Sequence, residues 1–253
     1  MKILTSNDDG VRALGNKVLR EVLSEGHEVV TIAPNRERSS CGHGITLGEP
    51  IRLNQIRENV YACSGFPADC ILVGLGHLLK DDRPDLVVSG INIGANLGQD
   101  RFYSGTIAAA REAAFRGVPA IAASLCLKSM SEELYFEDAA RFLKKIIDMQ
   151  VHKIMPPMSL LNINIPNLPE NKIKGVKIAA TGYQIYSEEV VERQDIRGKS
   201  YYWVGGIYQG HRDIAGSDCN VVNEGYISIH PQDLWGKDIV EESTLRSLEA
   251  CLK

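Results

Sequence analysis

The stretch Ile3–Gly10 (Ile-Leu-Thr-Ser-Asn-Asp-Asp-Gly) and the two segments after it constrain the fold more than any other part of the chain. A short apolar run begins at Ile3, and the polar residues 7–10 end it, because Asn, Asp and Gly favour turns. The apolar spacing of Leu14–Ser24 then predicts a helix. A second apolar run follows at Glu28–Ala33. A strand, a helix and a strand in this order predict a βαβ unit with buried parallel strands.

Alternating strand and helix patterns continue along the chain. Further strands are expected at Ile45–Leu47, Ile51–Leu53 and Val60–Ala62 (an edge ribbon), and at Leu86–Ser89, Ala120–Ala123, Leu160–Ile165, Val176–Ala179 and Gly225–His230. Further helices are expected at Pro67–Leu79, from a Ser104 cap to about Arg116, at Glu132–Met149 and at Ile239–Leu252. Ile185–Arg193 and Tyr201–Val204 flank a polar turn and predict a long β-hairpin arm.

These patterns predict an α/β fold. We expect a three-layer, doubly wound, Rossmann-like architecture with a mainly parallel sheet, a C-terminal extended β-hairpin arm and a terminal helix. Residues 1–150 are expected to form the core that binds metal and phosphate. Residues 151–253 are expected to add strands, the arm and the last helix, and to serve oligomerisation. An arm of this kind either pairs with a partner subunit or stays a self-contained edge hairpin.

Composition excludes several classes of protein. Of the 253 residues, 44% are hydrophobic and 24% are charged, which is ordinary for a globular protein. The net charge is -4 and basic residues are scattered, so we expect neither a nucleic-acid polymer nor a membrane surface as partner. The chain has no signal-peptide pattern and no long apolar run, so a cytoplasmic location is expected. The six cysteines lack CxxC spacing and are expected to be reduced rather than to bind zinc.

Three polar segments follow three of the predicted parallel strands. They contain Asp8 and Asp9, then Ser39, then Asn92. Since the carboxyl ends of parallel strands converge at one edge of a sheet, these side chains are expected to meet. Oxygen ligands suit Mg²⁺, Mn²⁺ or Ca²⁺, and two adjacent carboxylates favour a nearby cation. The simpler interpretation is an Asp-rich turn that caps the first helix.

A fourth polar segment, Tyr103–Thr106, precedes a predicted helix. Its hydroxyl groups and the free N–H groups of a helix N-terminus form an anion site. A P-loop is absent, and Gly74-Leu-Gly does not complete GxGxxG. The sequence therefore indicates neither a P-loop nucleoside triphosphatase nor a nicotinamide enzyme.

Together, these segments resemble the survival protein SurE family of nucleotide phosphatases. The motifs are Asn7-Asp-Asp-Gly10, Ala33-Pro34 with Arg38-Ser39, Ser89-Gly-Ile-Asn92 with Gly94, Asn96 and Gly98, and Tyr103-Ser-Gly-Thr106. The resemblance runs from Lys2 to about Pro231. It implies metal ligands at Asp8, Asp9, Ser39 and Asn92, and phosphate-binding residues at Asn96, Ser104, Gly105 and Thr106. It also implies one divalent cation per subunit, Mg²⁺ or Mn²⁺, and a homodimer or homotetramer that exchanges the arm and the C-terminal segment.

The resemblance implies a metal-dependent phosphomonoesterase, a 5′-nucleotidase that cleaves nucleoside monophosphates and whose substrates extend to short polyphosphate. In this hypothesis a metal-activated water attacks phosphorus, and Asp8 or Asp9 assists as a catalytic residue. His43 either contacts phosphate, acts as an acid or closes its loop. Two alternatives stay open at this point. One is a nucleotide-sensing module without turnover, and the other is a glycosyltransferase-like fold, which usually has an Asp-x-Asp motif that this chain lacks.

Overall fold

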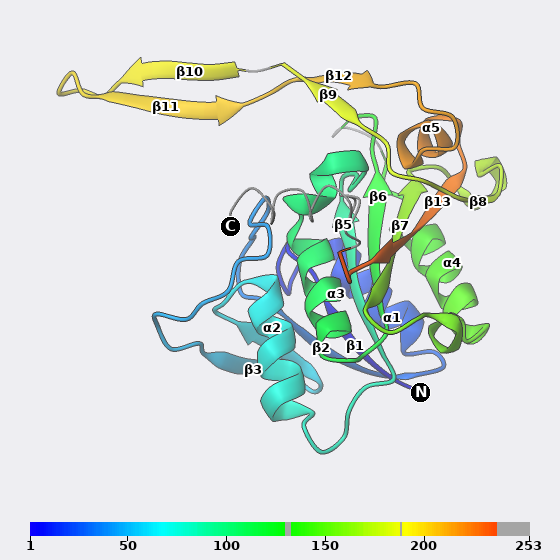
Figure 1. The fold of residues 1–253 in the computed structure, drawn as a ribbon. Coiled ribbons are helices and arrows are strands. Elements are labelled where there is room, and N and C mark those ends of the chain that lie inside the picture. Colours follow the sequence, from blue (N-terminus) through cyan, green and yellow to red (C-terminus); the bar gives the residue numbers. More distant parts are fainter. Residues whose placement is uncertain (130–132, 188, 237–253) are drawn as a thin grey trace, which may run out of the picture.

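One mixed sheet forms the centre of the structure, a computed structural model that describes residues 1–129, 133–187 and 189–236 (Figure 1). Across these residues the sheet has nine strands in the order β3-β4-β2-β1-β5-β6-β7-β13-β8. In that order the strands are Leu53–Arg57, Val60–Cys63, Glu28–Pro34, Lys2–Ser6, Leu86–Ile93, Ala120–Cys126, Ser159–Pro166, Ile227–Asp233 and Val176–Ile178.

Parallel pairing dominates the middle of the sheet. Strands β4, β2, β1, β5, β6 and β7 run parallel, β3 and β13 are antiparallel to their neighbours β4 and β7, and β8 is parallel to β13. Strands β2, β3 and β4 lie on one side of β1, and β5 and the later strands lie on its other side. The strand order therefore reverses at β1. Such a switch point leaves a crevice at the carboxyl ends of the strands. The predicted doubly wound α/β fold is confirmed.

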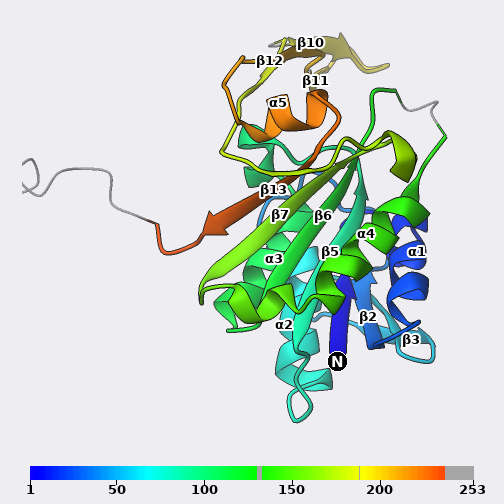
Figure 2. The ribbon, with the colours of Figure 1, turned by 90° about the vertical axis from the view of Figure 1, so that its right-hand side faces the viewer.

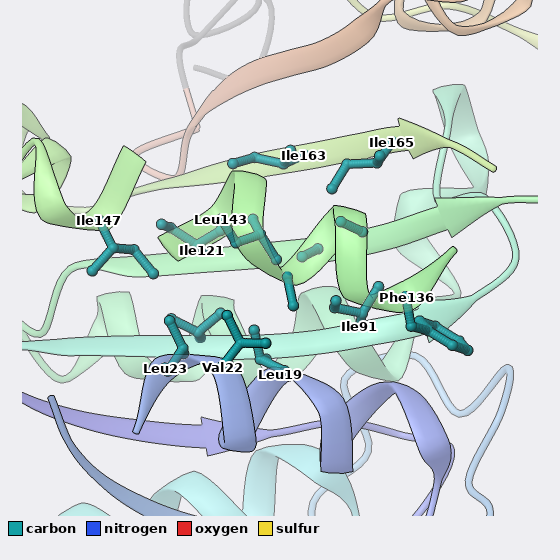
Figure 3. Packing of buried hydrophobic residues seen from close by; sticks show 14 of the residues in the cluster. Leu19, Val22, Leu23, Ile91, Ile121, Phe136, Leu143, Ile147, Ile163 and Ile165 are labelled. Atoms are coloured by element: carbon teal, nitrogen blue, oxygen red, sulfur yellow. The ribbon is translucent and has the colours of Figure 1, made fainter. Parts of the chain in front are cut away.

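Helices cover both faces of the sheet, which gives three layers (Figure 2). Helices α1 (Leu14–Leu23) and α4 (Phe136–Asp148) pack on one face, and α2 (Pro67–Val73) and α3 (Gly105–Phe115) pack on the other. On the first face, Leu19, Leu23 and Leu143 lie over the sheet, and all three are fully buried (Figure 3). Burying such side chains is the main favourable term in folding, about 1.5–3 kcal/mol each.

Helix α3 is buried along nearly all of its length. Its alanines at 108, 109, 110 and 113 are fully buried, because small side chains let the helix lie close to β5 and β6. Ser104 caps it as the sequence predicts, since its Oγ accepts the Ile107 N–H at 3.1 Å. This packing fixes the N-terminus of α3 at the carboxyl edge of the sheet.

The C-terminal part of the chain adds strands to the sheet and a projecting arm. Strands from before and after residue 150 belong to one sheet. The division into two parts near residue 150 stays a prediction. The predicted hairpin is present as two ladders, β9 (Gln184–Tyr186) with β12 (Tyr208–His211) and β10 (Glu189–Gln194) with β11 (Ser200–Gly205) (Figure 1). Helix α5 (Asp218–Asn223) leads into β13. The helix expected at Ile239–Leu252 lies outside the described residues.

Several predicted elements have different bounds. The ribbon segment expected at Ile51–Leu53 is β3 at Leu53–Arg57, and in the helix expected at Pro67–Leu79, α2 ends at Val73 and a π-helical turn follows at Gly74–Leu78. Residues 45–47 form no strand, so the edge ribbon consists of β3 and β4. Helix α4 begins at Phe136 rather than at Glu132, which itself lies outside the described residues. Glu137 and Asp138 then occupy its first turn, where the helix dipole favours acidic groups.

Strand β5 is longer than the sequence indicated. It continues past Ser89 to Ile93, although Gly90 suggested a loop. Ile91 is fully buried, and the pairing with β6 shifts register between Ser89 and Asn92 before it resumes. Burial of Ile91 thus extends the strand and places Asn92 on it. None of the described helices is long and apolar enough to cross a lipid bilayer.

Candidate metal centre and phosphate site

The turn after β1 places two carboxylates at the switch point. The Nδ2 group of Asn7 donates to the Gly10 carbonyl at 3.0 Å, and Gly10 adopts a φ of +102°, which glycine tolerates best. The turn is tied to the loop after β2, because the Arg38 N–H donates to the Asp8 carbonyl at 2.7 Å. Asp8 and Asp9 therefore leave the strand alternation and lie together beside the end of β5.

Asp8 is the more deeply buried of the two carboxylates, with 4% of its surface exposed. The Thr106 hydroxyl donates a short hydrogen bond to its Oδ1. Burial raises the pKa of Asp8, while the Thr106 hydroxyl and backbone amides, those of Gly105 and Thr106 among them, act in the opposite direction. The N-terminus of α3 thus orients the Asp8 carboxylate.

Asp9 lies closer to solvent and is held by β5. The Ile93 N–H donates to its Oδ2 at 3.2 Å. Burial, and next the negative charge of Asp8, raise the pKa of Asp9 to about 7. Repulsion between the two carboxylates is therefore part of this site.

Ser39 and Asn92 complete the oxygen-rich group. Asp8, Ser39 and Asn92 all line one pocket of about 580 Å³. Ser39 is exposed and donates to Glu37 at 2.8 Å. Asn92 donates through Nδ2 to the Gly94 carbonyl at 2.8 Å, so its amide oxygen remains available.

These residues fit a hard divalent cation. Within the described residues, neither Asp8 nor Asp9 forms an ion pair, although the pKa of each is raised. The available donors are carboxylate, hydroxyl and amide oxygens, which Mg²⁺ and Mn²⁺ prefer over soft ligands. A cation held by Asp8, Asp9, Ser39 and Asn92 would also neutralise the repelling carboxylates. The ligand set itself stays a prediction.

Asn96 is held in place by side chains of β6 and β7. Its Nδ2 donates to Ser124 at 2.8 Å, and its N–H donates to Asn164 at 2.9 Å. Its carbonyl accepts from Asn162 at 2.8 Å and from Asn164 at 3.2 Å. The loop after β5 is therefore anchored to the sheet by buried amides, which the alternation in Leu160–Ile165 did not reveal as site residues.

The predicted phosphate segment Ser104–Thr106 lies at the pocket, but its members differ in their contacts. Ser104 lines the pocket. A Cβ on Gly105 would lie 2.8 Å from the Asp8 Cβ and 2.8 Å from the Cys41 Sγ, so any side chain there collides with the metal-site turn. The Thr106 hydroxyl is engaged by Asp8. Direct phosphate binding by Asn96, Ser104, Gly105 and Thr106 stays a prediction.

The comparisons with known proteins identify the family and bear out the fold. The family model described as "Survival protein SurE" matches residues 3–188. The chain belongs to the SurE family. Proteins named 5′-nucleotidase SurE are 44% identical over 92% of this chain and 93% of the relative in Geotalea daltonii, and 40% identical over 100% and 96% in Vibrio vulnificus. The crystal structure of the SurE protein from Aquifex aeolicus is 36% identical, covers both chains fully and superposes with a TM-score of 0.85.

The sequence did not indicate that residues at the base of the arm line the pocket in this SurE-family chain. Tyr186, Ser187, Gly205 and Gly206 from the base of the arm line it together with Asp100. The Tyr186 hydroxyl donates to Asp100, which joins the arm to the turn before α3. Only pairing across the fold brings these distant residues together, so no local motif marks them.

Asp218 does not itself line the pocket, but it holds three segments of the fold together. It is fully buried, and its oxygens accept the N–H groups of Gly98 at 3.0 Å, Gly182 at 2.8 Å and Cys219 at 2.8 Å. It thus connects the loop after β5, the base of the arm and α5. Charge-assisted bonds of this kind are about twice as strong as neutral ones.

His43 does not line the pocket. Its Nε2 lies 3.0 Å from Glu112, and its ring stacks on Phe115 with centroids 5.9 Å apart. These contacts attach the loop that carries Ser39 to the side of α3. The geometry favours the loop-closing role over a role as acid or phosphate ligand.

Proposed function

We propose that this chain is a metal-dependent 5′-nucleotidase that hydrolyses nucleoside 5′-monophosphates to a nucleoside and inorganic phosphate. The observation that carries the proposal is the meeting of Asp8, Ser39 and Asn92 in one pocket, with Asp9 beside them and the N-terminus of α3 at its wall. The relatives named 5′-nucleotidase SurE support the substrate class.

Asp8, Asp9, Ser39 and Asn92 are the proposed ligands of one Mg²⁺ or Mn²⁺. When bound, the cation supplies positive charge to a phosphoryl oxygen and lowers the pKa of a water molecule. Asp8 is oriented by Thr106 and serves as a fixed ligand. Asp9 has one oxygen on the Ile93 N–H and a second that the described residues leave without a hydrogen bond, so we assign to Asp9 the orientation of the attacking water.

The opposite side of the phosphate would face Ser104 and Asn96. The Ser104 hydroxyl lies at the N-terminus of α3, next to the positive end of the helix dipole. Donors fixed before the reaction stabilise charge that develops on phosphoryl oxygens without reorganising. Asn96 is suited to this because four polar contacts already fix its position.

The test is phosphate release from adenosine 5′-monophosphate by the purified protein. We expect release to stop with EDTA and to return with Mg²⁺ or Mn²⁺. Adenosine 3′-monophosphate and short polyphosphate, assayed in parallel, define the substrate range. A folded protein that binds the nucleotide with metal but releases no phosphate would instead support a sensing module.

We also propose that the arm mediates a homodimer or homotetramer. Val190, Trp203 and Val204 are more than half exposed on the arm, at 63%, 62% and 84%. A projecting two-stranded ribbon with such side chains is rarely stable alone and gains from pairing. The base of the same arm lines the pocket, so assembly and substrate binding involve one element.

A further inference from the structure

A second pocket lies next to the candidate active site and is lined by cationic and amide side chains. Its volume is about 290 Å³. Arg101 comes from the 3₁₀ turn Gly98–Phe102, Arg111 from α3, and His230 and Gln232 from β13. We call this the arginine pocket. It is separate from the first pocket, which Asp100 lines from the same turn.

Neither arginine of this pocket has an ionic partner among the described residues. Arg101 donates to the Thr181 hydroxyl at 2.6 Å, and Arg111 lies 3.5 Å from a ring nitrogen of His43. Burial lowers the pKa of both arginines, and the charge of Arg101 lowers that of Arg111 further. Both remain charged, since arginine does not lose its proton in proteins. Two partly buried like charges therefore line the same pocket, and an anion would relieve the repulsion between them.

Nearby carboxylates do not neutralise the pair. Asp218 attracts Arg101, but its oxygens accept three backbone N–H groups instead. Asp233 also lines the pocket, and its Oδ1 accepts the Trp235 N–H at 3.1 Å. Neither carboxylate lies within ion-pair distance of Arg101 or Arg111 in the described part of the chain.

Two further polar groups of the pocket lack hydrogen bonds. His230 and Gln232 are each 8% exposed, and their Nδ1 and Nε2 atoms have no hydrogen-bond partner among the described residues. The His230 Nε2 lies 3.4 Å from the Thr181 hydroxyl, so among the described residues Nδ1 is the ring nitrogen without a partner. This Nδ1 lies 3.9 Å from Asp218, beyond hydrogen-bond length. A buried donor without an acceptor costs free energy that a bound acceptor recovers.

We propose that the arginine pocket binds a phosphate-type oxyanion, either inorganic phosphate or the terminal phosphoryl group of a nucleotide. Two guanidinium groups offer forked donors that match a tetrahedral oxyanion, and the Gln232 amide adds another donor. The pocket is a binding site in addition to the catalytic one, and its existence does not depend on the proposed hydrolysis.

The test is calorimetric titration of the full-length, metal-loaded protein with inorganic phosphate. We expect two phosphate sites per chain, one in each pocket. The double variant Arg101→Gln/Arg111→Gln should lose one site or bind there at least tenfold more weakly. Arg57→Gln, an exposed arginine on β3, is the matched control and should keep both sites. A methylene-bridged analogue of adenosine diphosphate, titrated in parallel, distinguishes a nucleotide phosphoryl group from free phosphate by its tighter binding.

Crystals of the wild-type protein soaked in tungstate provide a test that needs no variant. We expect anomalous density within hydrogen-bond distance of both guanidinium groups. Phosphate binding that is the same in the wild type and in a folded double variant would overturn the proposal, whether one site or two are counted. Density for a carboxylate of this chain or of a second copy between the arginines would do the same. Because binding is counted without turnover, a failure of hydrolysis leaves this result intact.

Discussion

At the scale of single residues, the site depends on close contacts more than on the identity of its ligands. Asp8 is placed by the Thr106 hydroxyl, and Gly105 leaves the space that the carboxylate occupies. A residue that binds nothing can therefore matter as much as a ligand.

Gly105→Ala tests this packing. The new methyl group would lie 2.8 Å from Asp8, so the turn must shift, and we expect at least a tenfold loss of activity on adenosine 5′-monophosphate with weaker metal binding. Such a loss corresponds to about 1.4 kcal/mol or more. Gly48→Ala is the control, because its Cβ would meet nothing within 4 Å. Equal activity of the two variants across a metal titration would contradict the packing argument.

The variant Asp9→Asn tests how the charge of the Asp9 carboxylate affects the stability of the folded protein. The folded, metal-free protein holds a proton on Asp9 up to its pKa of about 7, whereas the unfolded chain releases it near the ordinary pKa of an Asp side chain, 3.8. Between these values the folded state binds more protons, so stability falls as pH rises through this window. The substitution should remove a destabilisation of roughly 2–4 kcal/mol at pH 8.

Thermal unfolding of the EDTA-treated proteins at pH 5 and pH 8 measures this effect. The wild type should lose more stability than Asp9→Asn over that interval, and added Mg²⁺ should stabilise only a protein with its carboxylates intact. Parallel pH curves for the two proteins would show that Asp9 is not destabilised by the site.

At the scale of elements, β7 controls the loop that follows β5. Asn162 and Asn164 donate from their buried side-chain amides to the Asn96 carbonyl. The strand thereby does more than fill the core, since it sets where a candidate phosphate ligand lies.

Asn164→Ala should make the loop that follows β5 less well ordered. It leaves the Asn96 N–H without its acceptor, which costs about 1–3 kcal/mol of stability. We expect KM for adenosine 5′-monophosphate to rise several-fold, as Asn96 loses its fixed position. Asn54→Ala on the exposed strand β3 is the control, and unfolding and steady-state kinetics are the measurements. Unchanged KM in Asn164→Ala would separate Asn96 from substrate binding.

At the scale of the whole molecule, the arm projects from the sheet while its base lines the pocket (Figure 1). Its outer strands are exposed, while its base reaches Asp100 through Tyr186. A partner subunit that binds the arm would thus also restrict the motion of one wall of the pocket.

Trp203→Asp tests the assembly. A charge at an apolar contact between subunits is costly, so we expect a smaller oligomer by light scattering and a higher KM with a nearly unchanged metal affinity. Leu47→Asp, at a side chain that is 91% exposed and outside the arm, should leave the oligomer intact. An unchanged mass of the Trp203 variant would remove the arm from the assembly.

The sequence by itself determined the architecture and the position of the Asn7–Gly10 turn, which carries the candidate metal ligands. Apolar runs that alternate with helical spacing leave few ways to bury both, and Asn-Asp-Asp-Gly after a first strand can end it only at the carboxyl edge. The N-cap at Ser104 is equally local, because it depends on residues three apart. These features follow from short-range chemistry, which a sequence displays directly.

The tertiary structure alone decided which residues support the site. Asp218, Asn164 and Tyr186 meet the loops before α3 from 68 to 120 residues away, through hydrogen bonds that no periodicity encodes. The length of β5 also depended on the fold, since the burial of Ile91 outweighed the turn tendency of Gly90. The arginine pocket has the same origin. Its unpaired cations come from a turn and a helix, its amide comes from the last strand, and only packing brings them together.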